Sequence, residues 1–178
     1  MDSDLERDPA QGRGWRRIFD VVVAAAMVVA AFVAIGASDV SYAASQPYWL
    51  MLGFGFAVAA LAIEWVHRGP GFSLARYAPR CALHWLGVIA ALEMVFLFID
   101  AGRFAGAGVG LLNGAILALG TFLAGVHANW RMLVIGVAIA LAAVLVALVE
   151  QYVWLLLGLG VIAVAAVVGI AHLRHGRG

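Results

Sequence analysis

The chain has 178 residues, of which 65% are hydrophobic and 12% are charged, and its formal net charge is +1. This composition lies outside the range of soluble globular domains. Apolar stretches occupy most of the length, which excludes a folded soluble domain of ordinary size in addition to them. Any function must therefore arise from membrane helices and their short connections.

Six apolar stretches follow one another along the chain, each close to twenty residues long. At about 1.5 Å per residue, each can cross a hydrocarbon core of about 30 Å as a helix. Helix is favoured because backbone amides in lipid must be bonded within their own segment. The predicted spans are 18–36, 48–66, 81–99, 104–126, 132–149 and 153–171. We predict an all-α integral membrane protein, a bundle of six transmembrane helices.

The basic residues are distributed unevenly about these spans. All eleven are arginine, and ten of them lie on one side of the predicted topology, with Arg103 alone on the other. The positive-inside rule predicts that both termini are cytoplasmic. The domain of spans would occupy 15–173, between a disordered cytoplasmic segment 1–14 and a cytoplasmic tail 174–178. Six tryptophans fall at predicted span ends and favour the same topology: Trp15, Trp49, Trp65, Trp85, Trp130 and Trp154.

Two boundaries depend on weaker signals. The last forty residues contain only one polar break, Glu150–Tyr152, without a proline. A single helix over 131–172 would be about 60 Å long, twice the membrane, so we predict a tight hairpin at that break. The first span could also be a signal peptide. Its length and the acidic stretch before it favour an uncleaved anchor.

The fourth span contains glycines at every fourth position. Gly102, Gly106, Gly110 and Gly114 form a ladder of GxxxG steps, which allows another helix backbone to approach closely. Asn113 lies beside the same seam, where its amide can bond across the contact for about 1 kcal/mol. The pattern predicts close helix packing. It leaves open whether the packed partner is internal or belongs to another protein.

An acidic residue, Glu93, falls near the middle of the third span. A carboxylate in lipid is costly when charged, so it pairs, faces water or stays protonated. One interpretation is a proton or cation site, with Asp100 on the same helix face seven residues later. The other is a structural hydrogen bond to a neighbouring helix. The sequence does not decide between them.

Histidines occur at the predicted cytoplasmic span ends. His67, His84, His127 and His172 could converge on a metal or haem, since neutral imidazoles are good ligands. Their spacing matches no metal-binding motif, and histidine is common at membrane interfaces, so we expect no cofactor. No nucleophile–base motif and no phosphate-binding glycine loop occur. We therefore predict a protein that is not an enzyme, with no nucleic-acid partner.

A family resemblance covers about residues 15–152. The segment Ala43–Trp49, the acid-plus-glycine turn at 100–102 and the pair Trp130–Arg131 occur in an order similar to that of the small membrane subunit of tripartite tricarboxylate transporters. The resemblance implies a non-catalytic subunit that docks on a large permease, with carboxylates as solutes. The last apolar stretch lies beyond it.

Three functions stay open at this point. The first is an accessory or assembly subunit of an inner-membrane solute transport complex, with lipid and a larger permease as partners. The second is a small homo-oligomeric carrier or channel, coupled to protons or ions through Glu93. The third is a haem or metal protein that uses the histidines.

Overall fold

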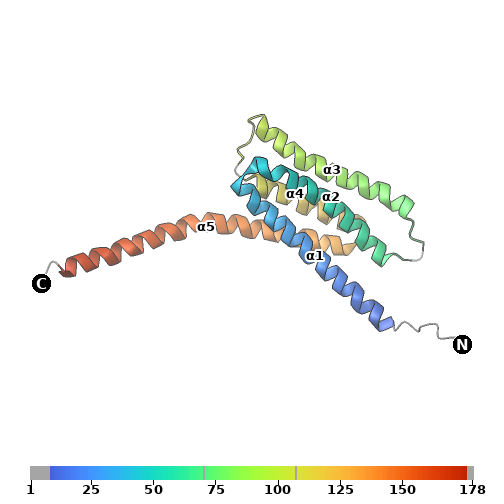
Figure 1. The fold of residues 1–178 in the computed structure, drawn as a ribbon, viewed down its shortest axis with the longest axis horizontal. Helices are drawn as coiled ribbons and strands as arrows, with labels where there is room; N and C mark the ends of the chain where they lie inside the picture. The colour runs from blue at the N-terminus through green and yellow to red at the C-terminus, as the bar shows by residue number, and fades with distance from the viewer. Residues whose placement is uncertain (1–8, 70, 107, 176–178) are drawn as a thin grey trace. The chain divides into compact units, whose positions relative to one another are not determined.

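The computed structural model describes the backbone of residues 9–69, 71–106 and 108–175, and in these ranges it contains helices and no strand. Side chains are described for 14–69, 71–106, 108–149, 152–153 and 157–163. Figure 1 shows the helices in chain order. They are α1 (Pro9–Val40), α2 (Tyr42–His67), α3 (Leu74–Asp100), α4 (Val109–His127) and α5 (Trp130–His175).

Each of the five helices contains a segment that is long and apolar enough to cross a membrane. The all-helical, multi-pass architecture predicted from the sequence agrees with them. The segments are Gly14–Val40, Tyr42–His67, Leu74–Asp100, Val109–His127 and Trp130–Val149.

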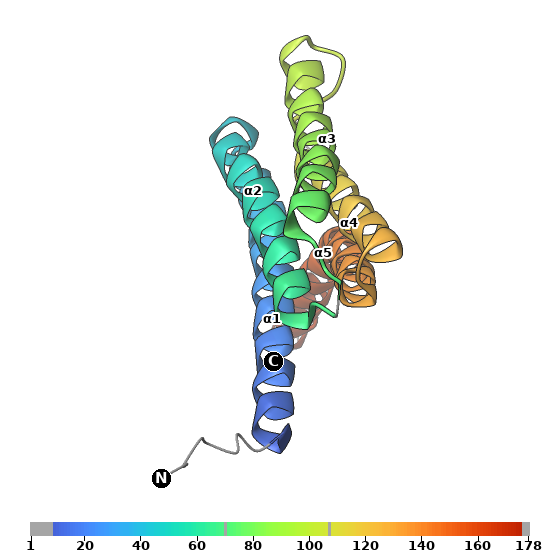
Figure 2. The same ribbon diagram turned by 90° about the vertical axis from the view of Figure 1, so that its right-hand side faces the viewer.

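The chain divides into two compact units, residues 1–143 and 144–178. The first unit, which we call the bundle, contains α1 to α4 and the first part of α5. Helix α1 packs against α2 and α4, and α3 packs against the same two helices. Figure 2 shows α1 beside α2 and α3 beside α4. The largest side chains of the core are almost fully buried: Ile35, Trp49, Phe56, Ile63, Trp85, Leu92, Leu117, Met132 and Ile139.

Successive helices of the bundle run in alternate directions, which gives it two chemically different ends. The basic end gathers the start of α1, the end of α2 and the start of α5, where Asp20 contacts His67 and Arg131. The acidic end joins α1 to α2 and α3 to α4, close to Asp39 and Asp100. The charge pattern that predicts the topology thus corresponds to a real separation of charge between helix ends.

The first two helices are longer than predicted. Helix α1 begins at Pro9, within the segment 1–14 predicted to be disordered, whereas residues 1–8 lie outside the described residues. Ser41 alone separates α1 from α2, and its hydroxyl accepts a hydrogen bond from the Ala44 amide at 3.3 Å. Small residues on both sides of Ser41 permit helix, and a serine cap is sufficient to restart it.

The start of the fourth helix corrects the predicted span 104–126. Helix α4 begins at Val109, because Gly102 and Gly108 adopt left-handed backbone conformations with φ of 70° and 88°. Glycine reaches this region without steric cost, and a chain that adopts it leaves the helix. Gly102 and Gly106 therefore lie in the turn before α4, outside the helix on which the ladder was placed.

The fifth helix differs from the predicted hairpin. Helix α5 is continuous through Glu150–Tyr152, where the sequence predicts a turn. No glycine or proline occurs between Gly136 and Gly158, and glutamate and glutamine are good helix formers, so polarity alone does not break the helix there. A sixth span at 153–171 stays a prediction.

The tryptophans are not all interfacial anchors. Trp49 and Trp85 are buried in the core, and Trp85 stacks edge-on against Phe56. Because α3 begins at Leu74, Trp85 lies about three turns inside it. These two residues are packing residues, whereas Trp15, Trp65 and Trp130 are exposed. The side chain of Trp154 lies outside the described residues.

Candidate functional site

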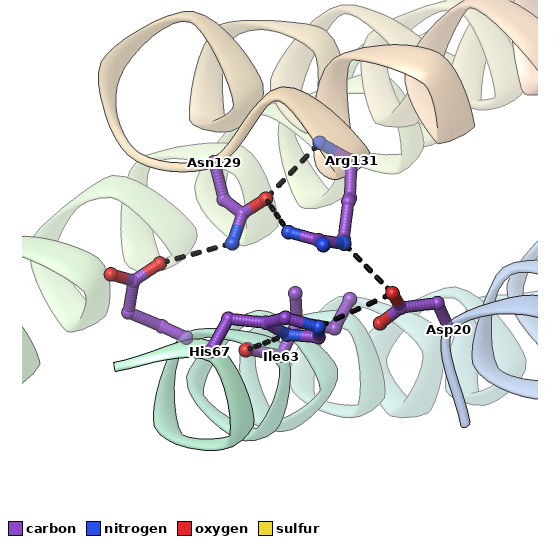
Figure 3. A network of polar contacts seen from close by, with 6 residues as sticks. Asp20, Ile63, His67, Asn129 and Arg131 are labelled. Atoms are coloured by element: carbon purple, nitrogen blue, oxygen red, sulfur yellow. Dashed lines mark hydrogen bonds and ion pairs between the residues drawn. The ribbon is translucent and has the colours of Figure 1, made fainter. Parts of the chain in front are cut away.

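A network of polar side chains joins three helices at the basic end (Figure 3). Arg131 at the start of α5 donates from Nε to Asp20 Oδ2 of α1 at 2.8 Å. Asn129, in the turn before α5, donates from Nδ2 to Glu64 Oε2 of α2 at 3.3 Å, and its Oδ1 accepts from the Arg131 amide. We call Asp20, Glu64, His67, Asn129 and Arg131 the basic-end cluster. It fixes the start of α5 against α1 and α2.

His67 completes this cluster through both of its ring nitrogens. Nδ1 lies 2.9 Å from the Ile63 carbonyl oxygen, and Nε2 lies 3.3 Å from Asp20 Oδ2. Both partners are acceptors, so both contacts form at once only when the ring carries two protons. The Asp20 carboxylate thus bridges one arginine and one histidine, and its other oxygen, Oδ1, is buried without a partner among the described residues.

The other histidines do not gather with His67. His84 Nε2 donates to the Gly120 carbonyl oxygen at 2.9 Å, and His127 Nδ1 donates to Leu123 of its own helix at 2.7 Å. Among the described residues, no group of three His, Cys, Asp or Glu side chains could hold a metal ion. The side chain of His172 lies outside the described residues. Each described histidine acts as a donor to a helix carbonyl instead.

The basic-end cluster gives a first prediction, for Asp20→Asn. The amide keeps the shape but removes the charge that both Arg131 and His67 face. The side chain of Asp20 is 22% exposed and that of Arg131 is 28% exposed. Because water screens a partly exposed pair, we expect the free energy of unfolding to fall by about 1–2 kcal/mol, less than for a fully buried pair. Thermal unfolding in detergent measures the loss. Asp39→Asn, at an exposed position of the acidic end, is the matched control, and equal midpoints for the two variants would contradict the prediction.

A second set of polar side chains lies inside the bundle near the acidic end. Gln46 of α2 donates from Nε2 to Glu93 Oε2 of α3 at 2.7 Å, while Glu93 Oε1 is buried without a partner in the described structure. Trp49 donates from Nε1 to the buried Ser38 hydroxyl at 2.9 Å. Glu93 lies about two turns before the end of α3, nearer the acidic end than the mid-span position predicted for it. Asp100 is exposed at the end of that helix.

Asn113 of α4 is fully buried, and neither its Oδ1 nor its Nδ2 has a partner among the described residues. It lies about one turn after the start of α4, so it too is near the acidic end. The contact of His84 with Gly120 sets the antiparallel register of α3 and α4 and places Glu93 level with Asn113. We call Ser38, Gln46, Trp49, Glu93 and Asn113 the acidic-end polar layer.

The unpaired amide leads to a second prediction, for Asn113→Leu. Leucine has the same branching and the same number of side-chain heavy atoms, and it removes two polar atoms that are buried without a partner among the described residues. We expect the free energy of unfolding to rise by about 1–3 kcal/mol. The matched control is Asn129→Leu, which deletes bonds to Glu64 and Arg131 and should lower the thermal midpoint. A lower midpoint for Asn113→Leu would mean that the amide is fully bonded.

The glycine seam packs within the chain. A methyl group at Gly110 would lie 2.6 Å from the Ile35 carbonyl oxygen of α1, and one at Gly114 would lie 2.8 Å from Ile35 Cδ1. Gly106 faces the ring of Tyr42 in the same way. Gly102 has no such neighbour within 4 Å. The ladder therefore seats α4 and its preceding turn on α1 and the start of α2, and Gly102 does not belong to the seam.

A second close contact, between α4 and α5, was not predicted from the sequence. A Cβ at Gly125 would collide with the backbone of Leu133, and one at Gly136 would collide with the backbone of Phe122. A further glycine, Gly120, lies against Val88 of α3. The signal was present as glycines in the fourth and fifth spans, Gly120, Gly125 and Gly136, but they do not share the four-residue spacing that identified the ladder.

Comparisons with known proteins add no relative. No family model, no curated protein and no solved structure matches the chain. The resemblance to the small subunit of tripartite tricarboxylate transporters therefore stays a prediction from short motifs.

Proposed function

We propose that this protein is a non-catalytic accessory or assembly subunit of a bacterial inner-membrane solute transport complex. The observation that supports this function is the division of its surfaces. Polar groups inside the bundle bond one helix to another, whereas only 22% of the apolar window of α1 and 33% of that of α3 is buried. Lipid can cover this apolar exterior, and a larger membrane partner of the kind that the family resemblance implies can cover part of it.

The proposed topology places the basic end of the bundle in the cytoplasm, in accord with the positive-inside rule. The N-terminus is then cytoplasmic. A cytoplasmic C-terminus would require the predicted hairpin at Glu150–Tyr152, where α5 is continuous, so this proposal covers the N-terminus alone. Carboxylates are the solute class implied by the family resemblance, and a large permease is the partner that it implies.

Affinity purification tests this function. The tagged protein is extracted in mild detergent, and the proteins that accompany it are identified and quantified by mass spectrometry, with a reciprocal tag on the main partner. A large multi-pass permease recovered in fixed ratio by both tags is the expected result. Recovery of this chain alone from both the mild extraction and a cross-linked sample would contradict the proposal.

A second candidate function is a small homo-oligomeric carrier or channel coupled to protons or ions. The specific observation that favours it is the acidic-end polar layer. Glu93 Oε1 and both polar atoms of Asn113 are buried without described partners, which is an expensive arrangement in a purely structural core. Such groups suit a site that receives a proton, a water molecule or a cation. Proton flux in liposomes, and its loss in Glu93→Gln, tests this candidate.

A further inference from the structure

A cleft of about 640 Å³ opens at the basic end between α1, α2 and α5. Its rim is polar and aromatic, formed by Arg16, Arg17, Asp20, His67, Trp130 and Arg131. Its wall is apolar and combines the buried Ile63 and Ile135 with the exposed Val21 and Val134. A charged rim above an apolar wall is the profile of an amphiphile site.

The charge of the rim favours an anion. Three arginines line the cleft against one carboxylate, that of Asp20. This carboxylate is already engaged by Arg131 at 2.8 Å and by His67 at 3.3 Å. The side chains of Arg16 and Arg17 are exposed on α1 and, among the described residues, are not part of the ion pairs of the cluster. Two guanidinium groups thus remain to bind an anionic oxygen group, with the bidentate geometry that suits phosphate.

The apolar wall favours a phospholipid over inorganic phosphate as the ligand. Val21 and Val134 are 63% and 51% exposed and lie next to the rim, and Trp130 is 65% exposed beside them. An inorganic phosphate would leave this wall uncovered, whereas an acyl chain would cover it. Tryptophan and arginine at a helix end are also the residues that belong at the level of lipid headgroups.

We infer that this cleft binds one anionic phospholipid, whose headgroup phosphate lies between Arg16 and Arg17 and whose acyl chain lies along Val21 and Val134. The site lies between the start of α1 and the start of α5, so a bound lipid would contact two of the helices that the basic-end cluster connects. This inference does not rest on the proposed function, because a subunit and an autonomous carrier could both hold such a lipid.

Native mass spectrometry of the purified full chain tests the site. Delipidated protein is titrated with phosphatidylglycerol and, separately, with phosphatidylcholine of the same acyl chains. We expect one tightly bound phosphatidylglycerol and no equivalent phosphatidylcholine. The attraction of one surface arginine to anionic lipid corresponds to about a fivefold change in affinity. In Arg16→Gln/Arg17→Gln, which lacks two such arginines, the dissociation constant for phosphatidylglycerol should therefore rise about 25-fold.

The matched control is Arg76→Gln/Arg80→Gln, which removes the same charge from exposed positions near the start of α3, outside the cleft. Its affinity should stay within about twofold of the wild type, because screening limits the reach of surface charges to about 8 Å. Three results would overturn the inference: equal binding of phosphatidylcholine, an equal loss in both double variants, or complete displacement of the lipid by inorganic phosphate at equal concentration.

Discussion

Gly110→Leu is expected to prevent stable packing of α1 against α4, with a loss of about 3 kcal/mol or more in the free energy of unfolding. A Cβ added at this position would lie 2.6 Å from the Ile35 carbonyl oxygen and 3.1 Å from Ile35 Cα. These are backbone atoms, so the collision cannot be relieved by a change of rotamer. The loss is measured by heating the protein in detergent and recording how much of the monodisperse size-exclusion peak remains at each temperature.

Gly87→Leu is the control for this variant. Gly87 also lies within a membrane helix, α3, but no atom of the described residues would lie within 4 Å of a Cβ at this position. Leucine has a higher helix propensity than glycine, so this variant should be as stable as the wild type or slightly more stable. Gly110→Ala should fall between the two leucine variants. Indistinguishable midpoints for Gly110→Leu and Gly87→Leu would show that the seam is not packed as described.

Glu93→Gln is expected to abolish proton-linked flux if the second candidate function is right. The glutamine keeps the length and shape of the side chain, and its amide can still bond to Gln46, so the helix contact that Glu93 makes at 2.7 Å is preserved. Only the carboxyl group, which can bind and release a proton, is lost. The measurement is the decay of a pH gradient across liposomes that contain the purified protein, followed with an enclosed pH-sensitive dye.

Asp100→Asn is the matched control, since it removes a carboxylate from the exposed end of the same helix. Asp100→Asn should retain the proton flux of the wild type. Both variants should have the thermal unfolding midpoint of the wild type. Flux that persists in Glu93→Gln would assign Glu93 a structural role as an interhelix hydrogen-bond partner. A wild-type protein without flux would remove the carrier candidate and leave the accessory subunit.

The sequence predicts the membrane helices well because their cause is local. A long apolar segment in lipid satisfies its own backbone, so hydropathy alone locates the cores of the first five spans. Helix ends depend on finer chemistry. Gly102 and Gly106 fit a four-residue helical spacing, but glycine also permits the left-handed turn that Gly102 adopts. The same residue type serves both states, and spacing does not distinguish them.

The polar sites depend on contacts that no local pattern determines. The sequence places Asp20, His67 and Arg131 near one membrane face but leaves the rotation of each helix about its axis open. Their convergence requires α1, α2 and α5 to turn these particular faces toward one another, which results from packing of the whole core. The partnership of Gln46 with Glu93 was missed because Gln46 lies between the predicted spans 18–36 and 48–66, whereas the structure places it in α2.

Tryptophans are enriched at membrane interfaces as a residue type, but an individual tryptophan can lie elsewhere. Interfacial residues favour tryptophan because one edge of the ring is polar. Trp49 meets that need inside the bundle, where its Nε1 donates to Ser38. A buried hydroxyl two residues from the end of α1 cannot be identified as a tryptophan partner before the register of α1 and α2 is known.

We propose that this bundle works as a subunit beside a larger membrane protein. Its most direct test is the protein mass of the complex in mild detergent, measured by size exclusion with multi-angle light scattering and corrected for detergent. The chain has a mass of 18.7 kDa. We predict a mass that includes a second, larger polypeptide in fixed ratio. A particle that contains only this chain, at 18.7 kDa or a whole-number multiple of it, would contradict the claim and favour an autonomous carrier.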